Sequence, residues 1–376
     1  MDILLINGTH PAAPHISGVR AGRFAAELAR MGHRCVLICP PVPGANAALL
    51  PSVPAHDWSE PLIIEADHPG MTRGGNKIAT FVNLLRYGGR CTAFQRSVVA
   101  RGRALAADFR PNVGWATFGS LEAVTALRTL AREQRFQWIF DNKDNPEIFI
   151  PRAARLPLAW RLRGYAALQA NSVLHADAAQ RWLGDTAEVI YSGVDACFFE
   201  PHAAPKHPQR YVTLVGSLYR GDMVDAILRA IAEFNATSAL SPVSVVHVGK
   251  QGDWIRSNHG VDVELPGYVS TDEMARLCQH ALANVYVFTG LTFHHKLFEL
   301  LACRRPVIAY GGELPESIAE AKRLHAPLTA PTDRRALVRA LAATEHFDPD
   351  PRMPKRFFTW SEQAALVEAA MRRIIG

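Results

Sequence analysis

"DILLINGTHPAAPHISGVRAGRFAAELARMGHRCVLICP", residues 2–40, carries the pattern that decides the fold. The apolar run at 2–7 predicts a strand, and the apolar run at 34–40 predicts another. Between them, residues 18–33 place apolar side chains at helical spacing and close on a glycine, which is typical of a helix C-terminus: Phe24, Leu28, Met31 and Gly32. A strand–helix–strand order predicts parallel strands covered by helices, so we expect an α/β fold.

The same alternation of strands and helices continues along the chain. Polar residues close three further predicted strands of the first half, at 115–120, 138–144 and 171–176. In open α/β sheets ligands bind at the carboxyl ends of the strands. A stretch with several prolines at 193–209 then interrupts the periodicity. A second α/β set follows, with predicted strands at 211–217, 243–249, 261–269, 283–288 and 305–312 and helices at 222–235 and 271–283.

Length and composition indicate a two-domain globular protein. The chain has 376 residues, more than the roughly 250–300 that a single core usually fills, so we expect two Rossmann-like domains with a cleft between them. Hydrophobic residues make up 48% and charged residues 20%, as in ordinary soluble proteins. The start lacks the features of a signal peptide, and no apolar run is long enough to span a bilayer.

The cysteines and the absence of several motifs exclude further classes of protein. Six cysteines are scattered without a CxxC pair, which favours a cytoplasmic, reducing compartment. No GxGxxG follows the first strand, which disfavours a nicotinamide dehydrogenase. No Walker A, GxSxG or HExxH motif occurs either.

Basic residues concentrate in the segment 73–110. The net charge of +6 does not by itself indicate nucleic-acid binding, and we expect no nucleic-acid partner. Between His68 and Arg110, however, eight basic residues stand against one acid, Asp108. Apolar residues are interleaved with them: Phe81, Leu84, Leu85, Tyr87 and Phe94. The segment is either a solvated helical face or an amphipathic helix that contacts an anionic membrane or a phosphate-bearing acceptor.

Residues 288–317 carry the richest set of chemical groups. A polar turn after a predicted strand leads into a predicted helix that starts at Thr289–Thr292, and a helix N-terminus is a natural seat for phosphate. On that helix Lys296 could neutralise a diphosphate, and Glu299 could accept hydrogen bonds from a ribose. The alternative is a solvent-exposed ion pair between these two side chains. His294 and His295 point about 100° apart on a helix and lack a third ligand nearby, so we expect no metal.

The stretch "FDNKDNPE" at 140–147 predicts a second functional edge in the first half. Asp141, Asn142, Lys143 and Asp144 close a predicted strand and could face the cleft. Asp141 or Asp144 could orient an acceptor hydroxyl. The alternative is an Asx-rich turn whose side chains bond their own backbone.

Five stretches, spread over nearly the whole chain, share one family's sequence pattern. "SGVRAGRFAAELARMGHRCVLI" (17–38) contains a glycine loop and helix–strand opening, and "VIYSGVDACFFEP" (189–201) a GVD motif. "LVGSLYRGDMVDAILRAI" (214–231), "HHKLFELLACRRPVIAYGGELPES" (294–317) and "FTWSEQAALVEAAM" (358–371) complete the pattern. Together they resemble GT-B glycosyltransferases, especially the family 4 retaining enzymes.

The resemblance implies a domain plan. Residues 1–200 would form an acceptor-binding Rossmann-like domain and residues 210–355 a domain that binds a sugar nucleotide. Residues 356–376 would form a helix that returns to the first domain.

The resemblance also implies roles for single residues. Glu299 matches the second glutamate of the family's E-x7-E pair, which holds the nucleotide ribose, while Leu291 occupies the place of the first. Arg220 matches a lysine that faces the diphosphate. Ser217 stands where many members carry an arginine, and Lys296 is a candidate replacement for that missing charge.

Further positions match main-chain contacts of the family. Gly18 matches the loop beside the donor phosphate, and Gly267, Tyr268 and Val269 match the turn that reads the base. The expected donor-binding set is Gly18, Ser217, Arg220, Gly267, Tyr268, Val269, Thr292, His294, His295, Lys296, Leu297 and Glu299. The expected catalytic set is Arg220, Lys296, Asp141 and Asp144.

The function that follows is transfer of a hexose from a nucleoside-diphosphate sugar to a hydroxyl of a glycan or lipid-linked acceptor. The resemblance implies retention of configuration. No D-x-D motif follows a strand end, so we expect no metal and no other cofactor, with a UDP-sugar as the default donor and a GDP-sugar close behind. A nucleotide-sugar epimerase of the same fold and a non-catalytic sugar-nucleotide-binding scaffold remain the alternatives. The expected partners are the sugar nucleotide, the acceptor and an anionic membrane contacted through 73–110.

Overall fold

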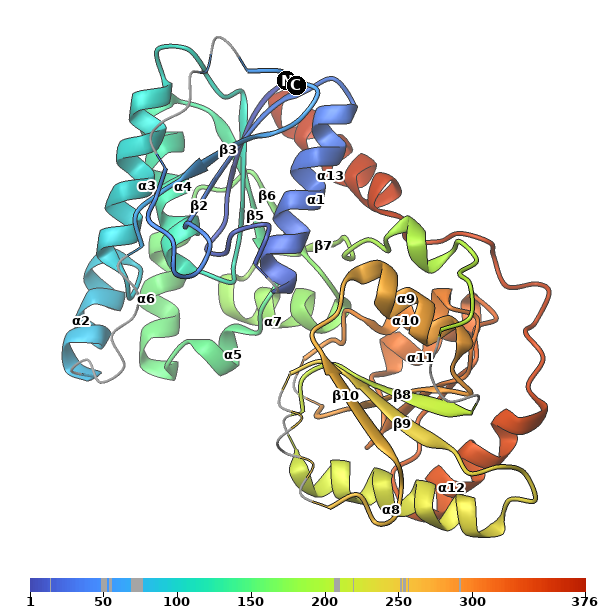
Figure 1. The fold of residues 1–376 in the computed structure, drawn as a ribbon. Helices are drawn as coiled ribbons and strands as arrows, with labels where there is room; N and C mark the ends of the chain where they lie inside the picture. The colour runs from blue at the N-terminus through green and yellow to red at the C-terminus, as the bar shows by residue number, and fades with distance from the viewer. Residues whose placement is uncertain are drawn as a thin grey trace. The chain divides into compact units, whose positions relative to one another are not determined.

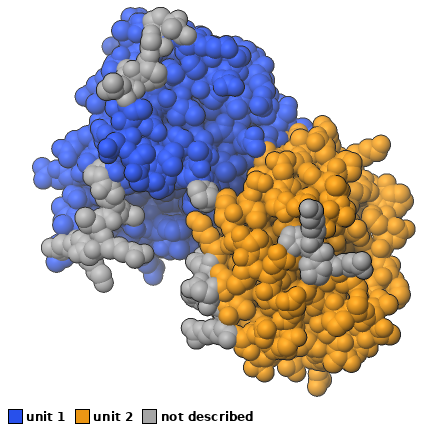
Figure 2. Space-filling view, viewed as in Figure 1, with its two compact units in different colours: residues 1–193, 360–376 blue, residues 194–359 orange. Residues whose placement is uncertain are grey.

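In the computed structural model the chain divides into two compact units (Figure 2). Unit 1 comprises residues 1–193 and 360–376, and unit 2 comprises residues 194–359. The structure describes residues 1–13, 15–48, 53, 56–68, 77–205, 210–218, 220–250, 252, 255, 257–290 and 292–376.

Unit 1 is built on a parallel sheet of seven strands in the order β3-β2-β1-β4-β5-β6-β7 (Figure 1). The strands are β1 (Asp2–Ile6), β2 (Arg34–Cys39), β3 (Leu62–Glu65), β4 (Val113–Thr117), β5 (Gln137–Asn142), β6 (Ala167–Ala170) and β7 (Glu188–Val189). The helices are α1 (Ile16–Arg30), α2 (Lys77–Tyr87), α3 (Thr92–Leu105), α4 (Leu121–Gln134), α5 (Pro146–Phe149), α6 (Arg152–Leu162), α7 (Val173–Leu183) and α13 (Trp360–Ile375).

The strands of unit 1 are apolar on both faces because helices cover both sides of the sheet. In β1, Leu4 and Ile6 pack into one buried cluster with residues of α3, α4, α6 and α7. Ile3 and Leu5 point the other way, into a second cluster with α1 and α13. Burial on both faces explains why the sequence of β1 is uniformly apolar rather than alternating.

Helix α13 belongs to unit 1, although unit 2 precedes it in the sequence. Trp360 packs its ring edge-on against Phe24 of α1, with 5.5 Å between ring centroids. Ala364, Val367 and Met371 are fully buried in the same cluster. The closing helix therefore packs on unit 1.

Unit 2 is built on a parallel sheet of six strands in the order β10-β9-β8-β11-β12-β13. The strands are β8 (Tyr211–Val215), β9 (Ser244–Val248), β10 (Val263–Gly267), β11 (Asn284–Val287), β12 (Val307–Tyr310) and β13 (Leu328–Thr329). The α-helices are α8 (Gly221–Thr237), α9 (Thr271–His280), α10 (Leu297–Ala302), α11 (Pro315–Arg323) and α12 (Arg334–Ala343), and η1 (Ala196–Phe198) and η3 (Thr344–His346) are 3₁₀ turns.

Both sheets reverse their strand order at one point, between β1 and β4 in unit 1 and between β8 and β11 in unit 2. Ligands of doubly wound sheets bind at the carboxyl ends of the strands beside such a reversal. The two sheets confirm the predicted α/β class with two Rossmann-like units.

Two local predictions are wrong. Residues 171–176 are not a strand: β6 ends at Ala170 and α7 starts at Val173, because the Ser172 side chain caps that helix by accepting from the His175 amide. The helix expected from Thr289–Thr292 onward starts only at Leu297. Gly290 has a φ of +76°, a left-handed conformation that cannot belong to a right-handed helix.

The described part of the basic segment, residues 77–110, contains α2 and α3 of unit 1. Leu84 and Phe94 are buried in its core, and Phe81 and Leu85 pack against that core. These four side chains therefore do not form a membrane-facing surface, whereas Tyr87 of the same segment is 40% exposed. Arg73 and the side chain of Lys77 lie outside the described residues. No helix in the described part of the chain has the length and apolar character needed to cross a bilayer.

Candidate functional site

The carboxyl edge of the unit 2 sheet is lined by glycine backbone where β8, β9 and β10 end. Gly216 follows β8 and Gly249 follows β9, and Gly267 closes β10. A Cβ atom on Gly249 would lie 2.1 Å from the Gly216 carbonyl oxygen, so no other residue fits there. The Gly249 amide donates to the Gly267 carbonyl at 3.0 Å. At this edge a ligand would therefore contact main-chain atoms rather than side chains.

Arg220 supplies a positive charge next to this edge. It occupies the N-cap position of α8 and is exposed. Its guanidinium forms two hydrogen bonds with Asp222, one of 2.9 Å from Nε to Oδ1. This contact lowers the pKa of Asp222 to about 2. An anionic ligand at this edge would share the guanidinium with Asp222 or displace it.

Lys296 is a second cation, at the N-cap position of α10. Its Nζ contacts the Met274 Sδ of α9 at 3.5 Å. The neighbouring Leu297 is fully buried, and its amide already donates to the His294 carbonyl at 3.0 Å. A hydrogen bond from the Leu297 amide to the donor, as predicted, would therefore require the bond to the His294 carbonyl to break. Thr292 is exposed, and Ser217 is half-buried at the end of β8.

His294 lies at the reversal point between β8 and β11. Its ring stacks on Tyr286 of β11, with 4.2 Å between ring centroids. Its Nε2 would lie 3.9 Å from a Cβ atom on Gly216. Burial, together with Lys296, lowers the pKa of His294 to about 4, so the imidazole is neutral at physiological pH. Its Nδ1 is buried without a hydrogen-bond partner among the described residues, which is uncommon and leaves it available to a ligand or a water.

A buried pair holds this ring in place. The Tyr286 hydroxyl donates to the carboxylate of Glu313, which also accepts from the Leu314 amide at 2.7 Å. Burial raises the pKa of Glu313 and that of Tyr286. The sequence analysis assigns Glu313 no role, because nothing in the sequence pattern shows that Tyr286 reaches it.

Glu299 and Tyr268 lie near each other on different elements. Glu299 is half-buried on α10, and Tyr268 follows β10 with 61% of its surface exposed. Burial and then the charge of Glu299 raise the pKa of Tyr268. A carboxylate can accept hydrogen bonds from the two hydroxyls of a ribose. An exposed aromatic ring beside it can lie against the base attached to that ribose. Val269 is half-buried beside Tyr268, and His295 packs its ring edge-on against Phe293.

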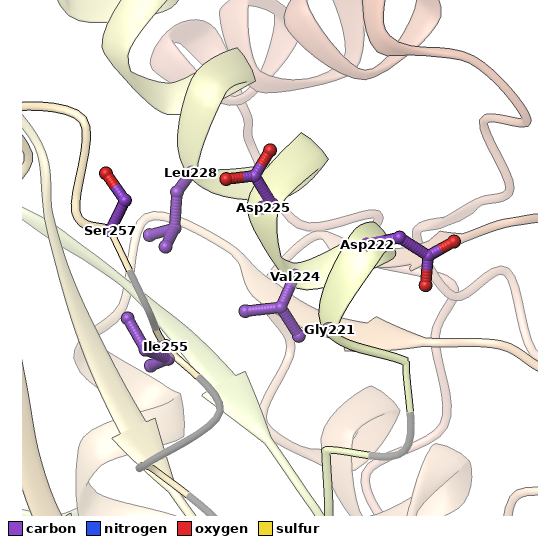
Figure 3. A pocket seen from close by; sticks show the side chains of 7 residues that line it. All are labelled: Gly221, Asp222, Val224, Asp225, Leu228, Ile255 and Ser257. Carbon is purple, nitrogen blue, oxygen red and sulfur yellow. The ribbon is translucent and has the colours of Figure 1, made fainter.

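A cavity of about 470 Å³ lies beside the first turns of α8 (Figure 3). Its lining residues are Gly221, Asp222, Val224, Asp225, Leu228, Ile255 and Ser257. Two carboxylates in the lining would repel a diphosphate. The cavity is therefore a poor phosphate seat, although Arg220 adjoins it in the sequence.

In unit 1 the predicted catalytic residue Asp141 lies inside the core. It is fully buried and forms a two-point ion pair with Arg20 of α1, at 2.8 Å from Nη2 to Oδ1 and 3.1 Å from Nε to Oδ2. Arg20 also donates to the Ile190 carbonyl and the Ser192 hydroxyl. Asp141 thus holds α1, β5 and the chain after β7 together. Sequence reasoning missed Arg20, because it falls within an ordinary helical pattern.

Unlike Asp141, Asp144 reaches solvent. It pairs with Lys143 at 2.8 Å, and its side chain is 24% exposed whereas that of Lys143 is 4% exposed. A Cβ atom on Gly119 would lie 3.4 Å from Asp144 Oδ2 and 2.9 Å from the hydroxyl of Ser17. Asp144 therefore sits where α1, the turn after β4 and the turn after β5 converge.

A buried polar group lies behind Asp144. Burial lowers the pKa of His175 to about 4, and its Nδ1 lies 2.6 Å from the Ser172 hydroxyl. Its Nε2 has no hydrogen-bond partner among the described residues, and the same holds for Asn142 Oδ1. Asn142 donates from Nδ2 to the His175 carbonyl. The spacing of these residues gave no sign that they meet.

Gly18 belongs to unit 1, whereas the rest of the predicted donor set belongs to unit 2. A Cβ atom on Gly18 would lie 2.2 Å from the His10 carbonyl oxygen. This internal contact by itself accounts for glycine at the position. Leu291 lies outside the described residues. Within the described residues, no three His, Cys, Asp or Glu side chains gather closely enough to hold a metal ion.

Comparison with known proteins adds a family match. Residues 209–344 match the model of the family "Glycosyl transferases group 1". No curated protein sequence matches the chain significantly. The matched range covers the glycine edge, Arg220, Lys296 and Glu299.

Solved structures share the fold of the whole chain. Sucrose-phosphate synthase from Thermosynechococcus elongatus aligns with a TM-score of 0.71 at 15% identity, over 100% of this chain and 99% of that one. Anabaena HepE in complex with UDP-glucose gives 0.62 at 14%, over 99% and 97%. A putative UDP-N-acetylglucosamine 2-epimerase from Listeria monocytogenes gives 0.62 at 10%, over 99% and 96%.

Together these findings confirm three predictions. The fold is GT-B, the resemblance to GT-B glycosyltransferases holds, and the domain match supports the enzyme class, a glycosyltransferase.

Proposed function

We propose that this chain, which carries a group 1 glycosyl transferase domain in a GT-B fold, moves a hexose from a UDP-sugar to a hydroxyl of a glycan or lipid-linked acceptor. The observation that carries the proposal is the arrangement at the unit 2 edge. There a glycine backbone, two cations and a carboxylate beside an exposed tyrosine lie within the range that matches the family.

The difficult step in such a transfer is the departure of the diphosphate. The bond between the anomeric carbon and the diphosphate oxygen breaks, and the acceptor oxygen forms the new bond to that carbon. The acceptor proton passes to the departing phosphate oxygen, on the same face as the attack, so configuration is retained and no strong base is needed. Arg220 and Lys296 would stabilise the charge that develops on the diphosphate.

Neutral His294 fits the same site in a different way. As an uncharged imidazole with an unsatisfied nitrogen, it can hydrogen-bond the donor without adding a buried charge. Glu299 would accept hydrogen bonds from the ribose, and Tyr268, next to Gly267, would lie against the base. The role of Glu299 is the one that the resemblance implies, whereas Tyr268 would act through its side chain and not only through the main chain of its turn.

We favour a UDP-sugar, with a GDP-sugar as the second choice. The similar Anabaena structure contains UDP-glucose, which supports this preference. We also propose that no metal is required, because two protein cations are available for the diphosphate. Activity that survives chelation with EDTA would support this, whereas recovery only after adding Mg²⁺ or Mn²⁺ would contradict it.

On the acceptor side we propose Asp144, with Lys143, rather than Asp141. Asp144 reaches solvent, and Asp141 is sealed in its pair with Arg20. A half-exposed carboxylate can orient an acceptor hydroxyl by accepting its proton in a hydrogen bond.

A nucleotide-sugar epimerase is the second candidate, since epimerases are among the structures that share this fold. The test is incubation with a panel of UDP- and GDP-sugars, with and without glycan and lipid-linked acceptors. Acceptor-dependent release of UDP, with an anomeric configuration that NMR shows to be retained, supports the transferase. A free sugar nucleotide of inverted C2 configuration supports the epimerase, and binding without turnover supports the scaffold.

A further inference from the structure

One side of unit 1 exposes large apolar side chains. On α6, Leu156 is 68% and Trp160 67% exposed, and on α2, Ile78 is 73% and Val82 48% exposed. Ile148 and Phe149 of α5 are exposed as well. These six residues define what we call the α2–α6 face.

These residues form outward stripes on helices that already bury another side. Leu158 and Leu162 of α6 and Leu84 of α2 are buried in the core of unit 1. Leu156 and Trp160 are one turn apart on α6, and Ile78 and Val82 are one turn apart on α2. A helix packed on a core usually has a polar outer side. A second apolar stripe on that outer side indicates that another surface covers the stripe.

The three helices adjoin, so the stripes form one surface. Helices α2 and α6 pack side by side on unit 1 (Figure 1). Arg161 of α6 donates to the Leu85 carbonyl of α2 at 3.2 Å, and Arg90 donates to the Phe149 carbonyl of α5 at 2.7 Å. These contacts join α6 to α2, and the turn after α2 to α5.

The charge around this face is strongly one-sided. Helices α2, α3 and α6 contain no acidic residue. Arg86, Arg90, Arg152 and Arg163 are exposed around the stripes. The Arg163 guanidinium lies 5.8 Å from the centre of the Trp160 ring. The acid on α5, Glu147, is already paired with Arg181 at 2.9 Å.

The whole of the net charge resides in unit 1. Unit 1 holds 23 Lys and Arg against 17 Asp and Glu, which is the chain's full +6, whereas unit 2 holds 18 of each. Exposed apolar residues with a Trp, bordered by arginines, match the composition of surfaces that lie on anionic bilayers. A second copy of the chain is a poor occupant, because a two-fold contact would bring the same arginines against each other.

We infer that the α2–α6 face docks unit 1 on the surface of an anionic membrane. Leu156, Trp160, Ile78 and Val82 enter the boundary between headgroups and acyl chains, and the arginines contact lipid phosphates. Helix α5 begins directly after Asn145, next to Asp144, so the face reaches the edge that we assign to the acceptor. This link to a lipid-linked acceptor rests on the proposed function, whereas the membrane contact itself does not.

The test is flotation of the full-length protein with vesicles, without nucleotide or acceptor. Vesicles of phosphatidylcholine alone are compared with vesicles that also contain phosphatidylglycerol. We expect binding that requires the anionic lipid and weakens with salt. The double variant Leu156→Asp/Trp160→Asp should lose about tenfold or more in partitioning. Arg86→Glu/Arg152→Glu should lose at least about fivefold per arginine.

Matched controls come from unit 2. Leu240→Asp changes a leucine that is 54% exposed, and Arg335→Glu/Arg339→Glu reverses two exposed charges on α12. Both should bind vesicles like the wild type. Circular dichroism and UDP affinity, measured without vesicles, should be unchanged in all variants, which separates this inference from the proposed function.

Three results would overturn the inference. The wild type could fail to float with anionic vesicles. The unit 2 controls could lose as much binding as the α2–α6 variants. Light scattering could show a dimer that Leu156→Asp/Trp160→Asp dissociates, which would make the face a contact between copies of the chain.

Discussion

At the scale of single residues, the site in unit 2 depends on groups whose charge is set by their surroundings. Arg220 lowers the pKa of Asp222 to about 2, and burial beside Lys296 lowers the pKa of His294 to about 4, so His294 is neutral at physiological pH. The result is a site with two cations and a neutral imidazole rather than three positive charges. A diphosphate can be stabilised there without the cost of charging a buried imidazole.

The first prediction concerns Glu299. Replacing it by Ala should weaken UDP affinity by about 1–3 kcal/mol, because the ribose hydroxyls lose their acceptor. Isothermal titration with UDP measures the change. Glu320→Ala, on α11 and paired with Arg323, is the matched control and should bind UDP normally. Equal affinity in Glu299→Ala and the wild type would remove the ribose assignment.

The second prediction concerns Arg220. Arg220→Ala should lower kcat more than it weakens donor binding, because the diphosphate gains charge only as its bond to the sugar breaks. Arg229→Ala is the control: Arg229 is on the same helix and likewise pairs with an aspartate, Asp225, at 2.7 Å. A loss of donor affinity with kcat unchanged would contradict the leaving-group role.

The third prediction concerns pH. The pKa of His294 is about 4 in the folded chain against 6.5 for an ordinary histidine. Between these values the unfolded chain binds a proton that the folded chain does not, so stability falls as pH drops from 6.5 to 4. The loss should be about 3 kcal/mol, from about 1.4 kcal/mol per pH unit. Urea unfolding across this range measures it. His294→Gln should reduce the slope and leave the part that comes from His175, whose pKa is also about 4. An unchanged slope would count against the burial of the His294 ring.

At the scale of elements, the sequence predicted most strands because they are uniformly apolar and end in polar residues. The opening strand at 2–7 corresponds to β1 at Asp2–Ile6, and the run at 305–312 contains β12 at Val307–Tyr310. The predicted ends of the elements are wrong where a side-chain contact, and not the pattern of apolar residues, determines where an element starts. Ser172 caps α7 and turns an expected strand into a helix start.

The sequence was enough to propose the cations and glycines of the candidate site, because these residues lie in local motifs. Its long-range pairs were not. Arg20 and Asp141 are 121 positions apart, and Tyr286 and Glu313 are 27 apart. Such pairs form only because parallel strands bring their carboxyl ends to one edge of the sheet. The contacts between side chains at that edge cannot be read from the distance between the residues in the sequence.

The fourth prediction tests the Arg20–Asp141 pair as the link between α1 and β5. Asp141→Asn should destabilise unit 1 by about 3–5 kcal/mol, because a buried guanidinium loses its counter-charge. Glu133→Gln removes the partner of Arg103 in an exposed pair of similar two-point geometry and should cost less than about 1 kcal/mol. Chemical denaturation compares them. Similar small losses in both variants would show that the buried pair is not the link.

At the scale of the whole molecule, unit 2 is a continuous segment inserted into unit 1. Its two ends meet: Val194 and Thr359 form a parallel bridge, and the Val194 amide donates to the Phe358 carbonyl at 2.7 Å. Its apolar residues form a cluster of their own around β8, β9, β11 and α8. These features are what a segment needs to fold by itself.

The fifth prediction follows from this closure. A fragment of residues 194–359 should unfold cooperatively on heating, and UDP should raise its melting temperature, because ligand binding to the folded state stabilises it. The full chain with UDP serves as the reference. A fragment that is unfolded, or one that UDP does not stabilise, would show that unit 2 alone does not hold the nucleotide.

The position of α13 fixes the order in which the chain can mature on the ribosome. Unit 1 lacks the helix that covers Phe24 and its neighbours until unit 2 has been synthesised in full. The inserted unit is thus free to fold first, the reverse of the usual N-terminal-first order. During that interval the face of α1 that α13 later covers is an exposed apolar surface, so nascent chains stalled before Trp360 should be the form that molecular chaperones retain.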